Sequence, residues 1–341
     1  MPTGSLCIVP VIESLTGPAS FQLRLKAGLE QLGWEVQHDP ARPDTQAILV
    51  IAATRHIGPL LQARRRGVRV VQRLNGINWI HRKRNTGLGH YLRAEVRNRL
   101  LLFTRQSLAE RVVYQSRFAQ DWWHRVYGAA PGAEQVILNG VDLQAYSPQG
   151  AEQPPRDHIR VQVVEGHLAG GYEIGLDFAL HYAAALERAA GQRVQVVVAG
   201  QVDEAVRARA AQVFPSAWVE YSGALKRSEI PALHRTAHLF FSAELNASCP
   251  NAVIEALACG CPVTGFAAGA LPELVPDSAG RLAPYGGDPW NLDLPDFSAL
   301  ANRSLDLLSE QGRYRAGARQ WAEARLGQAA MTAAYEQALI G

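Results

Sequence analysis

The chain has 341 residues, of which 48% are hydrophobic and 19% are charged, and this composition excludes extended disorder. A chain of this length exceeds what one compact core usually holds, so we expect two domains. No run of about 18 apolar residues occurs, which predicts no membrane span. The short apolar run from Cys7 to Ile12 lacks a basic start, and we expect no signal peptide.

The net charge of +3 conceals an uneven distribution along the chain. Residues 1–150 contain 19 Lys and Arg against 10 Asp and Glu, whereas the remainder contains 15 against 21. Most of the basic excess lies between Arg55 and Arg99. Two explanations stay open, namely a solvated basic face and attraction to an anionic acceptor or a membrane surface. The asymmetry supports two domains with different tasks.

Strand and helix patterns alternate along the first half of the sequence. Phe21, Leu25 and Leu29 recur at helical spacing, and Gly33 can end that helix. Such alternation is typical of a parallel sheet with helices on both faces. The expected strands are 6–12, 34–37, 47–52, 68–74, 111–115 and 135–138, and the expected helices are 19–32, 59–66, 90–109 and 119–127.

A proline-containing polar segment at 146–157 predicts an interdomain linker, after which the alternation restarts. The expected strands are 159–164, 194–199, 218–221, 238–242 and 262–265, and the expected helices are 175–190, 204–213, 227–235, 251–258 and 313–339. We therefore predict an α/β protein of two doubly wound, Rossmann-like parallel-sheet domains facing an interdomain cleft. The expected divisions are 1–150, 151–325 and a C-terminal helix at 326–341 that packs back on the first domain.

The four cysteines are few and show no framework spacing, which favours free thiols in a reducing cytoplasm. They are Cys7, Cys249, Cys259 and Cys261. A metal site at Cys259-x-Cys261 is the competing interpretation, but it lacks a second pair of ligands. We expect small buried thiols and no metal.

One segment combines a lone carboxylate with a turn of small residues. The expected helix 251–258 is built of small or apolar residues, with Glu255 as its only charge. A carboxylate in a crevice can accept two hydrogen bonds from a vicinal diol such as a ribose. Beyond the next strand, a small-residue turn from Ala267 to Leu271 would let backbone amides approach a diphosphate. By composition alone this turn is equally consistent with a tight strand-to-helix connection.

The segment from His238 to Val275 resembles the donor-binding region of retaining glycosyltransferases of the GT-B fold, the family 4 type also called glycosyl transferases group 1. That family's pattern is Glu, seven residues, Glu, then Ala-x-Ala-x-Gly-x-Pro-Val, a Gly-rich turn and Pro-Glu. The matching residues are Glu255, Ala256, Ala258, Gly260, Pro262, Val263, Gly269, Pro272 and Glu273. Asn139-Gly140-Val141-Asp142 resembles the family's signature at the end of the N-terminal domain.

This resemblance implies transfer of a sugar from a nucleotide-diphosphate donor to a saccharide, lipid-linked or small acceptor, with retention of configuration and without a metal or other cofactor. Residues 1–150 would form the acceptor side and 151–325 the donor side. Glu255 would bind the ribose hydroxyls. The other implied donor-binding residues are Gly17, Gly166, His167, Asn251, Ala268, Gly269, Ala270 and Leu271.

The sequence departs from the family pattern at two places. Ala247 stands where the first Glu is expected, and the loop 164–173 lacks the usual Arg and Lys. Our candidates for catalysis are His81 and Arg73, which lie after and within the expected strand 68–74 of the first domain. Arg73 would compensate for the cations missing from the loop 164–173. A surface histidine in a basic loop is the plain alternative for His81.

Because the sequence departs from the family pattern at these two places, other functions stay open. The main alternative is a catalytically impaired GT-B protein that binds nucleotide or glycan, or that partners an active transferase. An epimerase on the same fold has nothing else in its favour, and a nicotinamide enzyme lacks the G-x-G-x-x-G pattern after the first strand. We expect a cytoplasmic protein without nucleic-acid partners, with peripheral contact to the inner membrane face as one explanation of its basic half.

Overall fold

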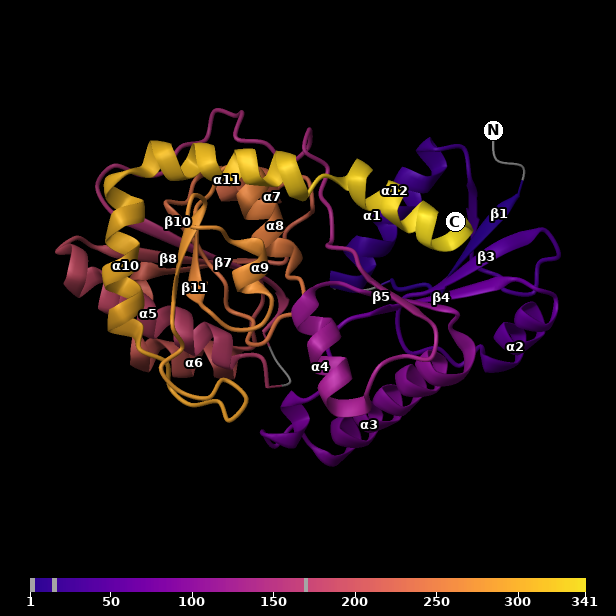
Figure 1. Ribbon diagram of the computed structural model, residues 1–341. Coiled ribbons are helices and arrows are strands. Elements are labelled where there is room, and N and C mark those ends of the chain that lie inside the picture. Colours follow the sequence, from indigo (N-terminus) through magenta and orange to yellow (C-terminus); the bar gives the residue numbers. More distant parts are fainter. Residues whose placement is uncertain (1–3, 14–16, 169–170) are drawn as a thin grey trace. The chain divides into compact units, whose positions relative to one another are not determined.

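The computed structural model describes residues 4–13, 17–168 and 171–341, and it divides the chain into two compact units. The first unit consists of Met1–Arg82, Thr86–Gly140 and Gly327–Gly341, and the second of Lys83–Asn85 and Val141–Leu326. The chain thus leaves the first unit after Gly140, earlier than the expected boundary at residue 150, and returns to it at Gly327 (Figure 1).

The first unit contains a six-stranded sheet in the order β2-β1-β3-β4-β5-β6, with all neighbouring strands parallel. Its strands are β1 (Ser5–Val9), β2 (Glu35–Gln37), β3 (Thr45–Val50), β4 (Arg69–Leu74), β5 (Arg111–Tyr114) and β6 (Ala133–Val136). Its helices are α1 (Gly17–Gln31), α2 (Ile57–Arg65), the 3₁₀ turn η1 (Ile80–Arg82), α3 (Leu88–Phe103), the π-helical turn η2 (Thr104–Leu108), α4 (Arg117–Tyr127) and α12 (Gln328–Ile340).

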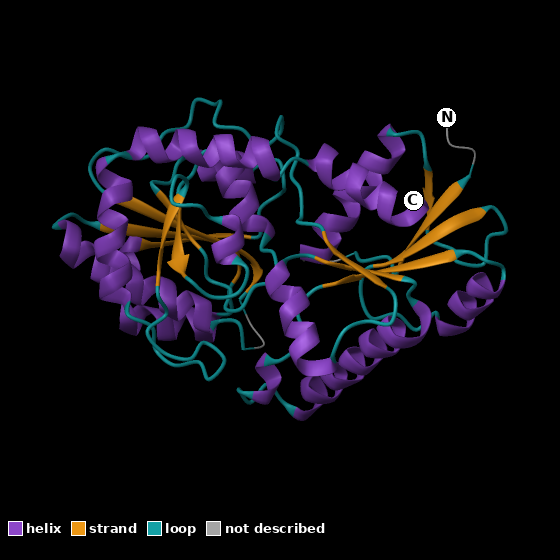
Figure 2. Ribbon diagram, in the orientation of Figure 1, coloured by secondary structure: helices purple, strands orange, loops and turns teal. Residues whose placement is uncertain are grey.

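Successive residues of β1 face opposite sides of this sheet, as the two-residue period of a strand requires. Leu6 and Ile8 join one buried cluster, together with residues of α1 and α12. Cys7 and Val9 join a second cluster, formed with residues of α2 and η2. Helices therefore cover both faces of the sheet, and the strand is apolar throughout because neither face meets water (Figure 2).

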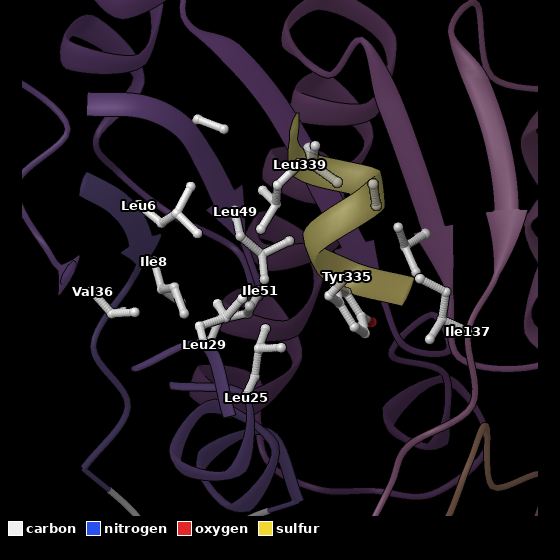
Figure 3. Packing of buried hydrophobic residues seen from close by; sticks show 14 of the residues in the cluster. Leu6, Ile8, Leu25, Leu29, Val36, Leu49, Ile51, Ile137, Tyr335 and Leu339 are labelled. Carbon is white, nitrogen blue, oxygen red and sulfur yellow. The ribbon is translucent and has the colours of Figure 1, made fainter. Parts of the chain in front are cut away.

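The C-terminal helix α12 is part of the core of the first unit. Tyr335 and Leu339 pack beside Leu49 of β3 and Ile51, which follows that strand (Figure 3). The ring of Tyr335 also lies 5.1 Å from that of Phe21 on α1. Residues that are distant in sequence thus complete one hydrophobic cluster.

The second unit contains another six-stranded parallel sheet, in the order β12-β11-β10-β7-β8-β9. Its strands are β7 (Ile159–His167), β8 (Val194–Gln201), β9 (Val219–Gly223), β10 (Leu239–Phe241), β11 (Val263–Phe266) and β12 (Gly280–Ala283). Its helices are α5 (Ile174–Ala190), α6 (Glu204–Val213), the 3₁₀ turn η3 (Ser216–Trp218), α7 (Ile230–Arg235), α8 (Asn251–Ala258), α9 (Leu271–Leu274), α10 (Phe297–Ser309) and α11 (Gln311–Arg325).

Neighbouring residues of β10 show that this sheet is also covered on both faces. The ring of Phe241 stacks on Tyr182 of α5 at 5.1 Å, whereas Phe240 meets His234 of α7 at 5.6 Å. The Tyr182 hydroxyl donates to Ser304 of α10 at 2.8 Å, which joins α10 to the α5 face. The predicted class of two doubly wound, Rossmann-like domains is confirmed.

The structure corrects the sequence expectation near the C-terminus. The helical segment expected over 313–339 consists of two helices, because α11 ends at Arg325 and α12, close to the C-terminal helix expected at 326–341, begins at Gln328. The break separates the two units, and the Leu326 carbonyl accepts a hydrogen bond from the amide of Val141 at 2.9 Å. The strand β12 and the helices α9 and α10 had no counterpart in the expectation.

Candidate functional site

The connections of the second sheet define where a ligand should bind. The first strand, β7, has β8 on one side and β10 on the other, so the strand order reverses between β7 and β10. In open α/β sheets, ligands bind outside the carboxyl ends of the strands at such a switch point. The segments that follow β7, β10 and β11 therefore form the candidate site.

Helix α8 carries a carboxylate near this edge. Its residues Val253 to Ala258 are buried, and Glu255 keeps 8% of its surface exposed. Asn251 lies four residues earlier, on the same side of the helix, and is partly exposed. The helix ends at Ala258, and the chain turns away at Gly260, whose φ of +68° suits glycine. Asn251 and Glu255 thus present an amide and a carboxylate from one helical face.

The turn after β11 requires glycine at position 269. Gly269 has a φ of +62°, and a Cβ there would lie 2.7 Å from the backbone nitrogen and oxygen of Ala247. The amide of Ala270 donates to the Ala247 carbonyl at 2.8 Å, and that of Ala268 donates to Phe266 at 2.7 Å. The Leu271 amide donates to Ala268 at 3.4 Å. Of the four amides expected to face a diphosphate, these three already donate within the protein.

The loop after β10 places two neighbouring residues under constraint. Ala247 is 1% exposed, because the turn at Gly269 packs on its backbone. Asn246 has a φ of +52° and is 4% exposed, and its side-chain nitrogen has no hydrogen-bond partner among the described residues. Buried amides are normally paired, so this nitrogen is a donor available to a bound molecule. In the sequence Asn246 stands next to Ala247 and could supply a weaker hydrogen bond in place of the missing Glu.

A β-bulge shapes the end of β7. The register with β8 shifts between Val164 and His167, so that Glu165 and Gly166 of β7 stand against the single residue Gly200 of β8. A Cβ on Gly200 of β8 would overlap the carbonyl oxygen of Glu165, so the bulge needs glycine on the neighbouring strand. The predicted residue Gly166 is exposed here, and the side chain of His167 lies outside the described residues.

Two carboxylates meet at the switch point. Removal from water raises the pKa of Glu165 well above its usual value, and the charge of Glu244 raises it further. Removal from water also raises the pKa of Glu244 to about 7. Glu244 is exposed and Glu165 is partly exposed, so water reaches both carboxyl groups, and the repulsion between them is a main cause of the raised pKa of Glu165. The pair places two carboxyl groups just beyond β10 and at the bulge near the end of β7.

One cation reaches the loop between β7 and α5, which contains no Arg or Lys of its own. Arg84, which groups with the second unit, donates to the Gly171 carbonyl at 2.9 Å and lies 3.2 Å from the Glu173 carboxylate. The Glu173 carboxylate also accepts from the Gly171 amide at 2.8 Å. Sequence reasoning missed Arg84, because it is far from this loop along the chain.

Arg73 lies in a buried network of the first unit. Its guanidinium donates to Asn75 at 2.8 Å and to Asn139 at 3.0 Å, and it lies 3.6 Å over the ring of Phe21. Gln115 links the two asparagines by donating to Asn75 and accepting from Asn139. The network joins residues at the carboxyl ends of β4 and β5 to Asn139 beyond β6, with Arg73 only 1% exposed.

His81 belongs to a separate cluster in the same unit. Its Nε2 lies 2.8 Å from the Glu95 carboxylate, which also accepts from Arg82 at 2.6 Å. These contacts, from Arg82 first and His81 second, lower the pKa of Glu95 to about 2. His81 is 4% exposed, and its Nδ1 has no hydrogen-bond partner among the described residues. The two catalytic candidates, His81 and Arg73, are thus held by different side chains.

The remaining predicted features have these positions. Gly17 is the first residue of α1 and is exposed, and Thr16 before it lies outside the described residues. All four cysteines are buried and free, and burial raises the pKa of Cys259 and Cys261 to about 12. In the described parts of the chain, no group of three or more His, Cys, Asp or Glu is placed to hold a metal ion.

The comparisons with known proteins agree with the fold. Residues 161–310 match the family model described as glycosyl transferases group 1. A comparison with curated proteins finds no relative of the chain. No helix within the described residues combines the length and apolar character needed to cross a bilayer.

Several solved structures share the architecture. Sucrose-phosphate synthase from Thermosynechococcus elongatus has a TM-score of 0.74 at 16% identity, with 98% of each chain covered. HepE of Anabaena in complex with UDP-glucose has a TM-score of 0.69 at 16% identity, with 99% of each chain covered. WaaG, a glycosyltransferase involved in lipopolysaccharide biosynthesis, has a TM-score of 0.70 at 12% identity, covering 99% of this chain and all of that one. These likenesses confirm the GT-B fold.

Proposed function

We propose that this protein is a glycosyltransferase that takes a sugar from a nucleotide-diphosphate donor and passes it to a saccharide, lipid-linked or small acceptor. The observation that carries this proposal is the position of Glu255 and Asn251 on one face of α8, at the edge where the strand order of the second sheet reverses. A nearly buried carboxylate at such an edge is suited to a ribose diol.

The comparisons support the same chemistry. The group 1 family match spans 161–310 and so contains Glu255, the turn at Gly269 and the bulge at Glu165. One structure of this fold, HepE, holds UDP-glucose, and a second structure, pneumococcal GtfA, holds UDP and GlcNAc. We therefore place the nucleotide of our protein at α8 and the diphosphate at the turn that contains Gly269.

The charges of the site favour one orientation of the donor. The carboxylates Glu165 and Glu244 repel a diphosphate, but they are good acceptors for sugar hydroxyls. The unpaired amide nitrogen of Asn246 can donate to a further hydroxyl or to a phosphate oxygen. We therefore assign the loop after β10 and the bulge of β7 to the transferred sugar. In this assignment Glu244 and Asn246 take the role of the first Glu of the family pattern, which is Ala247 in this chain.

The transfer that we propose retains the anomeric configuration and uses no metal ion or other cofactor. The acceptor hydroxyl attacks the anomeric carbon from the face that the diphosphate leaves. The bond between that carbon and the diphosphate oxygen breaks, and its electron pair stays on the diphosphate. The leaving diphosphate then takes the proton of the acceptor hydroxyl, so no side chain has to act as the base.

The test is a panel of nucleotide sugars in which release of nucleoside diphosphate and thermal shift are both measured. We expect release from one donor, and Glu255→Gln should weaken nucleotide affinity about 10- to 100-fold, the effect of losing hydrogen bonds to a charged group. Glu204→Ala, which removes an exposed carboxylate from α6, is the matched control and should leave affinity unchanged.

The outcomes separate the competing functions. Absence of both release and thermal shift with every nucleotide would contradict the proposal. Binding that depends on Glu255 without any release would favour the alternative of a GT-B protein that binds nucleotide or partners an active transferase.

A further inference from the structure

Helix α3 of the first unit exposes apolar side chains where a soluble helix normally carries polar ones. Leu88 is 74% exposed, Leu92 54%, Val96 50% and Phe103 42%. At roughly 100° per residue these four side chains project within an arc of about 80° and form one stripe along the helix. We call these four residues the α3 stripe.

The stripe faces away from the rest of the first unit. Only Ala94 and Asn98 of α3 are buried, and they lie on the opposite side of the helix. Asn98 is fixed by Asn78, since its Oδ1 accepts from the Asn78 amide at 3.0 Å and its Nδ2 donates to the Asn78 carbonyl at 2.9 Å. Figure 1 shows α3 as a long helix below the sheet of this unit.

A second anchor prevents α3 from rolling its stripe inward. Glu95 accepts from Arg82 at 2.6 Å and lies 2.8 Å from the ring nitrogen of His81. The ring of His81 packs on Tyr91 of α3 at 5.0 Å. The exposed apolar surface is therefore a fixed feature of the folded unit rather than a consequence of a loosely held helix.

The charges around the stripe are positive. At the same 100° per residue, Arg93 and Arg97 project about 60° and 100° beyond one edge of the stripe, whereas Arg99 projects within its arc. All three are exposed, and none of them pairs with a carboxylate in the described parts of the chain. The only acid of the helix, Glu95, is occupied by Arg82 and His81. From Arg55 to Arg99 the sequence holds 12 Lys and Arg against this single Glu.

We propose that α3 docks the protein on an anionic membrane surface, with the α3 stripe at the level of the acyl chains and with Arg93 and Arg97 on the lipid phosphates beside it. Arg99, which starts within the stripe, reaches the same phosphates by extending its long side chain toward water. A basic helix with an exposed apolar stripe lies in the plane of such an interface. A second copy of the chain fits less well, because pairing two such faces would bring arginines against arginines. The inference stands apart from sugar transfer, since vesicle binding requires no donor.

Vesicle flotation tests the proposal with the full-length protein. One set of vesicles contains phosphatidylcholine alone, and the other contains equal parts of phosphatidylcholine and phosphatidylglycerol. We expect binding only to the anionic vesicles, weakened at high salt because the Debye length shortens. Arg93→Gln with Arg97→Gln should lower the partition coefficient about fivefold for each arginine.

A second variant addresses the apolar part of the interface. Leu88→Ser, Leu92→Ser and Val96→Ser together should lower partitioning by about tenfold or more while leaving the net charge unchanged. These side chains are exposed, so far-ultraviolet circular dichroism and the thermal midpoint should match those of the wild type. That match separates lost docking from lost folding.

The control variant carries Arg55→Gln and Arg65→Gln, two exposed arginines outside α3, and loses the same charge. It should keep most of its binding. Equal loss in this control and in the Arg93 and Arg97 variant would show a diffuse charge effect and overturn the assignment to α3. Unchanged binding of the serine variant, or no binding of wild type to anionic vesicles, would also overturn it, and self-association lost in the serine variant would point to a second copy instead.

Discussion

The carbonyl oxygen of Ala247 accepts a hydrogen bond from the amide of Ala270 at 2.8 Å and so ties the loop after β10 to the turn after β11. Gly269 lies between the two connections and packs directly on the backbone of Ala247. The two loops that we assign to the donor therefore form a single rigid edge. Ala247, which stands where the family pattern has its first Glu, is the residue whose backbone Gly269 contacts.

Gly269→Ala should lower the stability of the protein more than the same substitution at a glycine with open space around it. The left-handed backbone costs about 1–2 kcal/mol for a residue with a Cβ, and the Cβ would also collide with the backbone of Ala247. The matched control is Gly191→Ala, because Gly191 has a φ of +64° and open space around its Cβ position. Urea unfolding should show a larger loss of unfolding free energy for Gly269→Ala than for Gly191→Ala. Only Gly269→Ala should also weaken nucleotide binding. Equal losses in both stability and binding would contradict the packing argument.

Glu244 should make stability depend on pH in the direction set by its raised pKa. Its pKa rises from 4.5 to about 7 on folding, so the folded state binds more protons between these values and stability falls as pH rises through them. Glu244→Gln removes this term and should be more stable than wild type at pH 8 but not at pH 4. We expect a difference below about 1 kcal/mol, since the side chain is exposed and water screens its charge. A variant that is less stable at pH 8 would contradict this account.

Arg73→Met should destabilise the first unit by about 2–3 kcal/mol, because the buried oxygen of Asn139 loses the hydrogen bond from Arg73 and the partly buried oxygen of Asn75 keeps only the one from Gln115. Arg66→Met is the control: Arg66 is exposed and donates to backbone carbonyls at the surface, so the loss should stay below about 1 kcal/mol. Urea unfolding gives both values. If Arg73→Met keeps its stability while sugar transfer falls, Arg73 is catalytic rather than structural.

His234 should make the protein sensitive to acid. Burial, with a smaller contribution from Arg235, lowers the pKa of His234 from 6.5 to about 3. The unfolded chain therefore binds a proton between these values that the folded chain does not, and stability is lost as pH falls below 6.5. The loss should reach about 2 kcal/mol at pH 5. His234→Gln, which can still bond to Gln162, should flatten this part of the stability profile, and an unchanged slope would argue against the assignment.

The fold could be predicted from local patterns, because buried parallel strands read as continuous apolar runs and Gly33 marks the end of α1 with a φ of +91°. The helix α10 was missed, although Asp296 caps it by accepting from the amide of Ala299 at 2.9 Å. An acidic cap followed by apolar residues at helical spacing was a signal that could have found it.

The candidate site was less accessible to sequence reasoning, for a physical reason. Glu255 and Gly269 lie in one continuous motif, so their chemistry shows locally. The exposure of Glu165 depends on a bulge that needs Gly200 on another strand, and the unpaired donor of Asn246 depends on how its loop folds. Arg73 was expected in a crevice, yet strand pairing and Phe21 enclose it. Such three-dimensional relations leave no pattern in one sequence.

The return of the chain into the first unit sets an order for folding during synthesis. Every residue of the second unit is made before Gly327–Gly341, which carries Met331, Tyr335 and Leu339 into the first unit's core. The second unit can therefore close while the first still exposes Leu49 and Ile51. A chain truncated after Leu326 would keep the whole second unit but would leave Leu49 and Ile51 without the helix that covers them, and this chain would be a substrate for chaperones.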